Sequence, residues 1–129
     1  MMSELPPNET VTETPDGAMR RIDALLSHVW MVRTFLKHSE EAEEIEELRE
    51  VHRELYDYML ALGGPWQAQD SAAYLKLAAK KLSKLRKITA QFVAEQPEIS
   101  SHTNFQMAAR SLQTAVGEIE SILTRFTAR

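Results

Sequence analysis

The stretch "FQMAARSLQTAVGEIESILTRF", residues 105–126, places an apolar side chain at every third or fourth position. The steps alternate between four and three residues through Phe105, Ala109, Leu112, Val116, Ile119, Leu123 and Phe126. An α-helix has about 3.6 residues per turn, so these side chains share one face. The pattern predicts a long amphipathic helix over residues 103–127 that packs against other helices.

Three earlier segments show the same periodicity. Residues 15–38 carry Ile22, Leu25, Val29, Val32 and Leu36 at heptad spacing, with Thr14 as the capping residue. Residues 39–62 predict a second helix, capped by Ser39 and ended by Gly63-Gly64-Pro65, and residues 71–97 predict a third. Short connections favour antiparallel neighbours. We therefore predict an all-α fold, an antiparallel up-down-up-down four-helix bundle; two helical hairpins that pair in a dimer are the alternative.

Length and composition limit the number of domains, the kinds of partner and the location of the protein. The chain of 129 residues suits one domain, with residues 1–14 as a disordered tail and residues 15–129 as the bundle domain. The net charge of -4 argues against nucleic acid as a partner, and the absence of cysteine excludes disulfides and thiolate metal sites. No apolar run approaches the roughly 20 residues that span a bilayer. We expect a cytoplasmic protein with no membrane partner.

Four polar residues interrupt the apolar faces of the first two predicted helices: Arg33, Glu41, Glu44 and His52. Antiparallel pairing across a turn at residues 38–40 places Arg33 opposite Ile45. This register predicts a salt bridge from Arg33 to Glu44 or Glu41. The cluster is either a register-setting ion pair or part of a ligand site, and both interpretations stay open here.

His52 lies on the apolar face without the partners that metal chemistry needs. Di-iron bundles place a glutamate three residues before the ligand histidine, and Arg49 occupies that position here. We therefore interpret His52 as a boundary histidine and predict no metal site and no cofactor.

The segment "SHVWM", residues 27–31, resembles the phospho-accepting segment of histidine phosphotransfer bundles. The resemblance implies that His28 is a candidate phospho-acceptor on an exposed helix face. Val29 stands where an acidic residue often follows such a histidine. The alternative is that His28 is an ordinary residue at the edge of the core.

Three short stretches are similar, in the same order, to segments of helical-bundle cobalamin adenosyltransferases. They are "TETPDG" (12–17), "RIDA" (21–24) and "LYDYMLALGG" (55–64). The first stretch lacks the Gly-Asp core of that family's loop, and the arginine-rich ATP-binding helix is absent. The resemblance implies at most that fold without its chemistry.

Leu26, Trp30 and Met31 lie beside the heptad face of the first helix and form a candidate surface for a protein partner or for a homodimer. Lys76, Lys80, Lys84 and Lys87 are expected to face outward, either as a solvated face or as a partner surface. The chain has no Gly-rich phosphate loop, no Gly-x-Ser-x-Gly elbow and no cysteine nucleophile. We therefore expect a non-enzymatic interaction or small scaffold protein. The alternatives are a ligand-binding or enzymatic bundle with a cobalamin-adenosyltransferase-like fold, and a histidine phosphotransfer-type bundle that uses His28.

Overall fold

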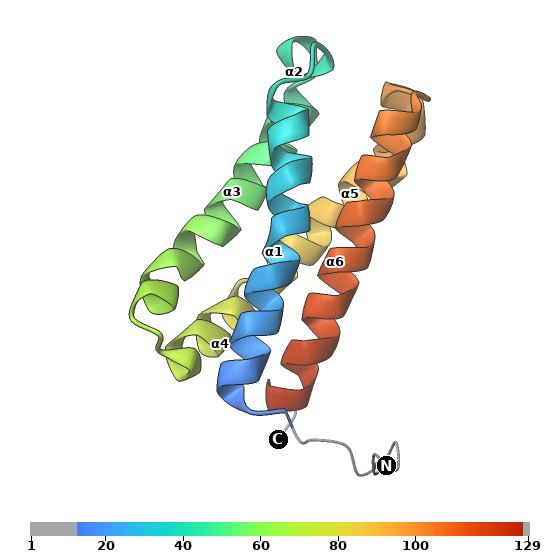
Figure 1. Ribbon diagram of the computed structural model, residues 1–129. Helices are drawn as coiled ribbons and strands as arrows, with labels where there is room; N and C mark the ends of the chain where they lie inside the picture. The colour runs from blue at the N-terminus through green and yellow to red at the C-terminus, as the bar shows by residue number, and fades with distance from the viewer. Residues whose placement is uncertain (1–12, 128–129) are drawn as a thin grey trace, which may run out of the picture.

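The computed structural model describes residues 13–127 as an all-α structure with no strand in that range. Six helices follow one another within this described range (Figure 1). They are α1 (Pro15–Lys37), α2 (Glu41–Glu44), α3 (Glu46–Gln67), α4 (Ser71–Lys80), α5 (Leu82–Ile99) and α6 (Thr103–Thr127). The sequence predicted four helices, and the count differs because the second and third predicted helices are each divided in two.

Helix α1 is the element against which the others pack, with contacts to α3, α4 and α6. It begins as predicted, because the Thr14 hydroxyl accepts a hydrogen bond of 3.0 Å from the Gly17 N–H and Pro15 fills the first turn. Ile22, Val29 and Leu36 from its heptad stripe are fully buried. The wide apolar face of α1 is therefore explained by a central position within this chain.

Helices α1 and α6 run in opposite directions, side by side (Figure 1). The ring centroids of Phe35 and Phe105 are 5.0 Å apart near one end, and His28 Nδ1 lies 3.2 Å from Ser111 Oγ further along. The predicted bounds of α6 are confirmed. Along its stripe, Leu112 and Ile119 are fully buried, because they face α1 and α5 together.

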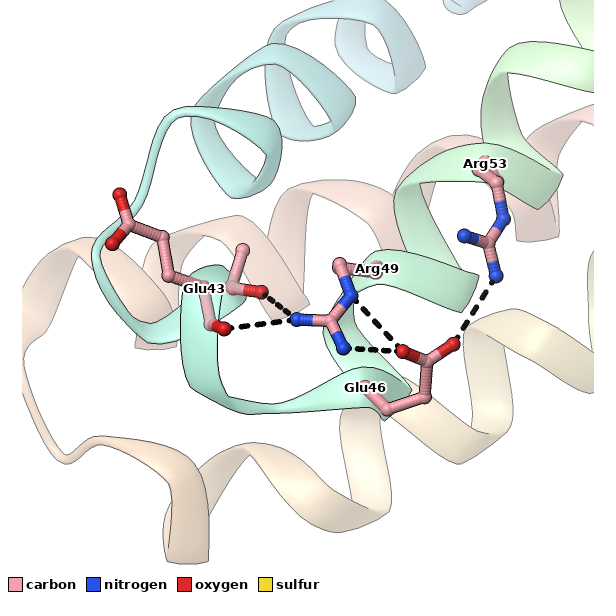
Figure 2. A network of polar contacts seen from close by, with 5 residues as sticks. Glu43, Glu46, Arg49 and Arg53 are labelled. Carbon is pink, nitrogen blue, oxygen red and sulfur yellow. Dashed lines mark hydrogen bonds and ion pairs between the residues drawn. The ribbon is translucent and has the colours of Figure 1, made fainter.

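The predicted second helix is interrupted at Ile45, whose backbone is extended (φ -110°, ψ 108°). Ser39 still acts as a cap, since its hydroxyl accepts a hydrogen bond of 3.2 Å from the Ala42 N–H. Arg49 bridges the interruption by donating to the carbonyls of Ala42 (2.8 Å) and Glu43 (3.0 Å) at the end of α2 (Figure 2). A cation at the C-terminal end of a helix complements its dipole and satisfies carbonyls that lack helical partners.

The prediction that Gly63-Gly64-Pro65 ends the helix is wrong, because α3 continues to Gln67. A residue before proline usually avoids the helical region, since its Cβ clashes with the proline ring; Gly64 has no Cβ. The helix instead ends in a Schellman motif, in which the Asp70 N–H donates to the Pro65 carbonyl and the Gln69 N–H donates to the Trp66 carbonyl. Gln69 supplies the left-handed residue of this motif (φ 53°).

Two tyrosines fix the place of α4, which lies between the diverging ends of α1 and α3 (Figure 1). The buried Tyr58 of α3 donates to the Ala78 carbonyl at 3.0 Å, and Tyr74 of α4 donates to Asp23 of α1 at 3.3 Å. Ala78 lies in the last turn of α4, just before the interruption at Lys81. The Tyr58 hydroxyl therefore satisfies one of the carbonyls that a helix end leaves without a helical partner.

The predicted disordered tail, residues 1–14, lies outside the described residues except for its last two. Those two, Glu13 and Thr14, are in contact with helices. Thr14 caps α1, and the Glu13 carboxylate accepts hydrogen bonds from Arg21 (2.7 Å) and Arg125 (3.1 Å). Glu13 thus joins the first turns of α1 to the end of α6. Among the helices of residues 13–127, none combines the length and apolarity needed to cross a membrane.

We predict that Gly63→Ala raises the free energy of unfolding by about 0.5–1 kcal/mol, because alanine has the higher helix propensity and restricts the unfolded chain. A Cβ built at Gly63 meets no atom within 4 Å. Gly64→Ala is the matched control and should gain less, because Gly64 precedes Pro65. Urea unfolding measures both. A lower stability for Gly63→Ala would contradict a helix through this segment.

We also predict that Tyr58→Phe lowers the free energy of unfolding by about 1–2 kcal/mol, because it leaves the Ala78 carbonyl without its buried donor. Tyr56→Phe is the control, since Tyr56 is exposed and its hydroxyl makes no hydrogen bond among the described residues. Urea unfolding of the two variants under identical conditions compares them. Equal stabilities would show that the hydroxyl of Tyr58 does not hold α4 in place.

Candidate functional site

Arg33 does not form the salt bridge that its position predicted. Its guanidinium carbon lies 4.9 Å from the ring centroid of Trp30 and 4.7 Å from that of Tyr56. Its Nε atom is buried and makes no hydrogen bond with any residue of the range 13–127. Such cation–π contacts are worth about 0.5–2 kcal/mol each, depending on how far water is excluded. Two aromatic faces, rather than a carboxylate, therefore hold this side chain.

The interruption at Ile45 explains why the predicted register is wrong. One continuous helix would have brought Ile45 opposite Arg33, but Tyr56 is there instead, eleven residues further along the chain. Glu41 and Glu44 belong to the separate turn α2. They line a shallow hollow of about 200 Å³ at the end of the molecule, together with Glu40 and Ile45. The structure therefore separates Glu41 and Glu44 from Arg33.

His52 is half-buried on α3, and positive charges surround it. Burial of the ring lowers its pKa below the usual value of 6.5, and the charges of Arg33, Arg53, Lys37 and Arg49 lower it further. Both causes disfavour the protonated ring. The sequence identified His52 and Arg33 as polar residues on the apolar faces of their helices. The structure places both in one cationic environment rather than in an ion-pair cluster.

The carboxylate of Glu46 is engaged by two arginines of this region (Figure 2). Arg49 donates to Glu46 Oε1 through both Nε and a terminal nitrogen, and Arg53 contacts Oε2 at 3.4 Å. The hydrogen bond from Arg49 is the main reason that the pKa of Glu46 is lowered. Because these groups are exposed, the pairs add little stability, but they orient Arg49 towards α2.

The predicted partner surface of Leu26, Trp30 and Met31 is divided by the fold. Leu26 is only 7% exposed and belongs to the core, so it cannot meet a partner. Met31 is 66% exposed, but it lies about 100° from Trp30 around the helix. Trp30 is 46% exposed and lies against Arg33. Of the three residues, Trp30 is therefore the one that is both exposed and in contact with Arg33.

We use the term α1–α3 surface for the side chains that lie against Arg33 or whose charges act on His52, together with these two residues. Its members are Trp30, Arg33 and Lys37 from α1 and His52, Arg53 and Tyr56 from α3. The sequence did not identify Tyr56 or Arg53 as site residues. Tyr56 follows His52 by one helical turn, which is the signal that could have revealed it. The corrected register, however, was needed to bring it to Arg33.

His28 lies on the other side of α1, where α1 meets α6. Its ring is exposed, and its Nδ1 lies 3.2 Å from Ser111 Oγ. The two residues line a hollow of about 330 Å³ together with Arg110, Leu25, Met107, Thr114 and Ala115. The hydrogen bond to Ser111 leaves Nε2 as the ring nitrogen available for chemistry.

A larger hollow, of about 530 Å³, lies between α3 and the junction of α4 with α5. Lys80, Lys81 and Lys84 line it opposite Glu54 and Asp57, and Lys84 contacts Glu54 at 3.3 Å. Neither Arg33 nor His52 lines this hollow or the other four described. The five hollows therefore give no support to the ligand-binding and adenosyltransferase-like alternatives. Among residues 13–127, no three histidine or acidic side chains gather as a metal site.

We predict that His52→Gln stabilises the protein more at about pH 5.5 than at about pH 7.5. The folded state lowers the pKa of His52, so wild-type stability is fully present above the unfolded value of 6.5 and declines as the pH falls. Urea unfolding across this range measures the difference, with His38→Gln at an exposed position as the control. A constant difference between wild type and His52→Gln would contradict the lowered pKa.

Comparisons with protein-family models, with curated proteins and with solved structures found no match to this chain. The geometry of the α1–α3 surface and of the His28–Ser111 pair is therefore the basis for proposing a function.

Proposed function

We propose that this protein is a non-enzymatic, cytoplasmic interaction module that uses its six helices as four segments of an antiparallel bundle. The segments are α1, α2 with α3, α4 with α5, and α6. Arg49 supports the first pairing by joining α2 to α3. The hydrogen bond of 3.1 Å from the Lys81 N–H to the Leu77 carbonyl supports the second, because it continues the helical pattern past the end of α4.

The observation that carries this proposal is the pair of exposed aromatic rings on the α1–α3 surface. Trp30 is 46% exposed and Tyr56 is 38% exposed, and the guanidinium of Arg33 contacts both rings. Tryptophan, tyrosine and arginine are the residues in which binding energy concentrates at protein interfaces. Contact with Arg33 restricts both rings before binding, which lowers the entropy lost when a partner covers them. The partner is another protein or a second copy that meets α1.

Photo-cross-linking in the source cell tests this proposal. We expect p-benzoylphenylalanine at position 56 to form a discrete adduct, because a partner covers that ring. The same group at position 87 is the control, since Lys87 is exposed on α5, a helix that contributes no residue to the α1–α3 surface. Trp30→Ala should abolish the adduct from position 56. Adducts of equal yield from both positions, or an adduct that survives Trp30→Ala, would contradict the proposal, and the adduct mass distinguishes a second copy from another protein.

The His28–Ser111 pair supports a second candidate function, histidine phosphotransfer. Ser111 fixes the ring of His28 through Nδ1, so Nε2 is left to attack a phosphoryl group, and Arg110 lines the same hollow. With phosphoramidate as donor, the bond from phosphorus to the amine nitrogen would break, ammonia would leave, and a bond from phosphorus to His28 Nε2 would form with loss of the ring proton.

Incubation with phosphoramidate tests this second candidate. Phosphotransfer predicts one acid-labile ³¹P resonance from the folded protein, lost in His28→Gln and kept in His38→Gln. Labelling of both variants alike would show non-selective chemistry at exposed histidines. The absence of labelling in the wild type would also reject the candidate.

A further inference from the structure

The α1–α3 surface carries more positive charge than the chain itself neutralises. Arg33 and Lys37 form no ion pair among the described residues, and Arg53 has a single contact of 3.4 Å to Glu46. Glu46 is also engaged by Arg49. Among the three arginine and lysine side chains of this surface, Arg53 alone therefore has a carboxylate partner, which it shares with Arg49, in a protein whose net charge is -4. A cluster of positive charge on the surface of a protein whose net charge is negative indicates an anionic partner.

Arg33 is prepared to meet that partner with the edge of its guanidinium group. Its guanidinium carbon lies over the rings of Trp30 and Tyr56, and its buried Nε makes no hydrogen bond with any described residue. The terminal nitrogens form the planar fork that recognises a carboxylate through two parallel hydrogen bonds. The aromatic contacts hold this fork in place, so little of the arginine's conformational freedom remains to be lost on binding.

We infer that the α1–α3 surface binds an acidic segment of another protein, with Arg33 donating to one of its carboxylates and Lys37 and Arg53 attracting others. This inference rests on the interaction role proposed above and adds the chemistry of the partner. The aromatic rings at Trp30 and Tyr56 supply apolar contacts beside the charges, as interface centres do.

An acidic peptide fits this surface better than a nucleic acid does. Arg33 already covers one face of each aromatic ring, which removes part of the stacking platform that single-stranded nucleic acid uses. The glutamates of α2 and the residue before it, Glu40, Glu41, Glu43 and Glu44, lie at the same end of the molecule and form no ion pairs through their side chains among residues 13–127. They would repel a long polyanion, whereas a short acidic segment need not reach them.

Fluorescence titration tests the inference in the full chain. Trp66→Phe leaves Trp30 as the sole tryptophan, so emission reports the α1–α3 surface directly. The probe is a peptide of three Glu-Glu-Leu-Ala repeats, and its control replaces every glutamate with glutamine. We expect saturable binding of the glutamate peptide alone, weakened by about tenfold or more in Arg53→Glu. Lys87→Glu makes the same change of charge on α5 and should alter the affinity less than about twofold.

Three results would overturn the inference. They are equal binding of both peptides, an equal loss in Arg53→Glu and Lys87→Glu, and tighter binding of an oligothymidylate of matched charge. Arg33→Gln, checked for folding by urea unfolding, is a second variant that should lose affinity. If these titrations fail while the cross-link at position 56 persists, the partner is not acidic but the interaction role stands. If the cross-link is also absent, both proposals fail.

Discussion

The extended backbone at Ile45, bridged by Arg49, determines how α3 lies against α1. The interruption ends α2 after one turn, and the guanidinium of Arg49 then donates to two carbonyls of that turn. This contact replaces the helical hydrogen bonds that the interruption removes. As a result α3 starts from a defined point and direction, and its residues meet α1 in the register that brings Tyr56 to Arg33.

The position of α4 compensates for the divergence of α3 from α1 (Figure 1). The gap would expose apolar side chains of both helices, and α4 closes it with the fully buried Tyr74. Burial raises the pKa of Tyr74 far above its usual value, and the neighbouring carboxylate of Asp23 raises it further. The pKa of Asp23 is raised as well, mainly by burial. The pair is therefore a hydrogen bond that joins α1 to α4.

The same register concentrates cations and aromatic rings on one exposed side of the molecule. A half-buried arginine is usually paired with a carboxylate, because burial removes water from the charge and an ion pair offsets part of that free-energy cost. Here two aromatic faces take that role at Arg33, and the carboxylates of α2 stay at the end of the molecule. The surface is left with a fixed guanidinium and two exposed rings, which is the combination that protein interfaces use.

The sequence by itself determined the all-α class, the bounds of α1 and α6 and most of the buried stripe, because apolar periodicity depends on local geometry alone. It also identified Arg33 and His52 as polar residues that interrupt apolar helix faces. Only the tertiary structure decided the interruptions at Ile45 and Lys81, the passage of α3 through Gly64 and Pro65, and the partner of Arg33. Arg49 bridges the interruption at Ile45, and Tyr58 donates to Ala78 beside the interruption at Lys81; such hydrogen bonds between separate turns or helices leave no period in the sequence. The site depended on the register of α1 and α3, and the connection through α2 and Ile45 brings Tyr56 rather than Ile45 to Arg33. Its residues could therefore be identified individually from the sequence, but their arrangement could not.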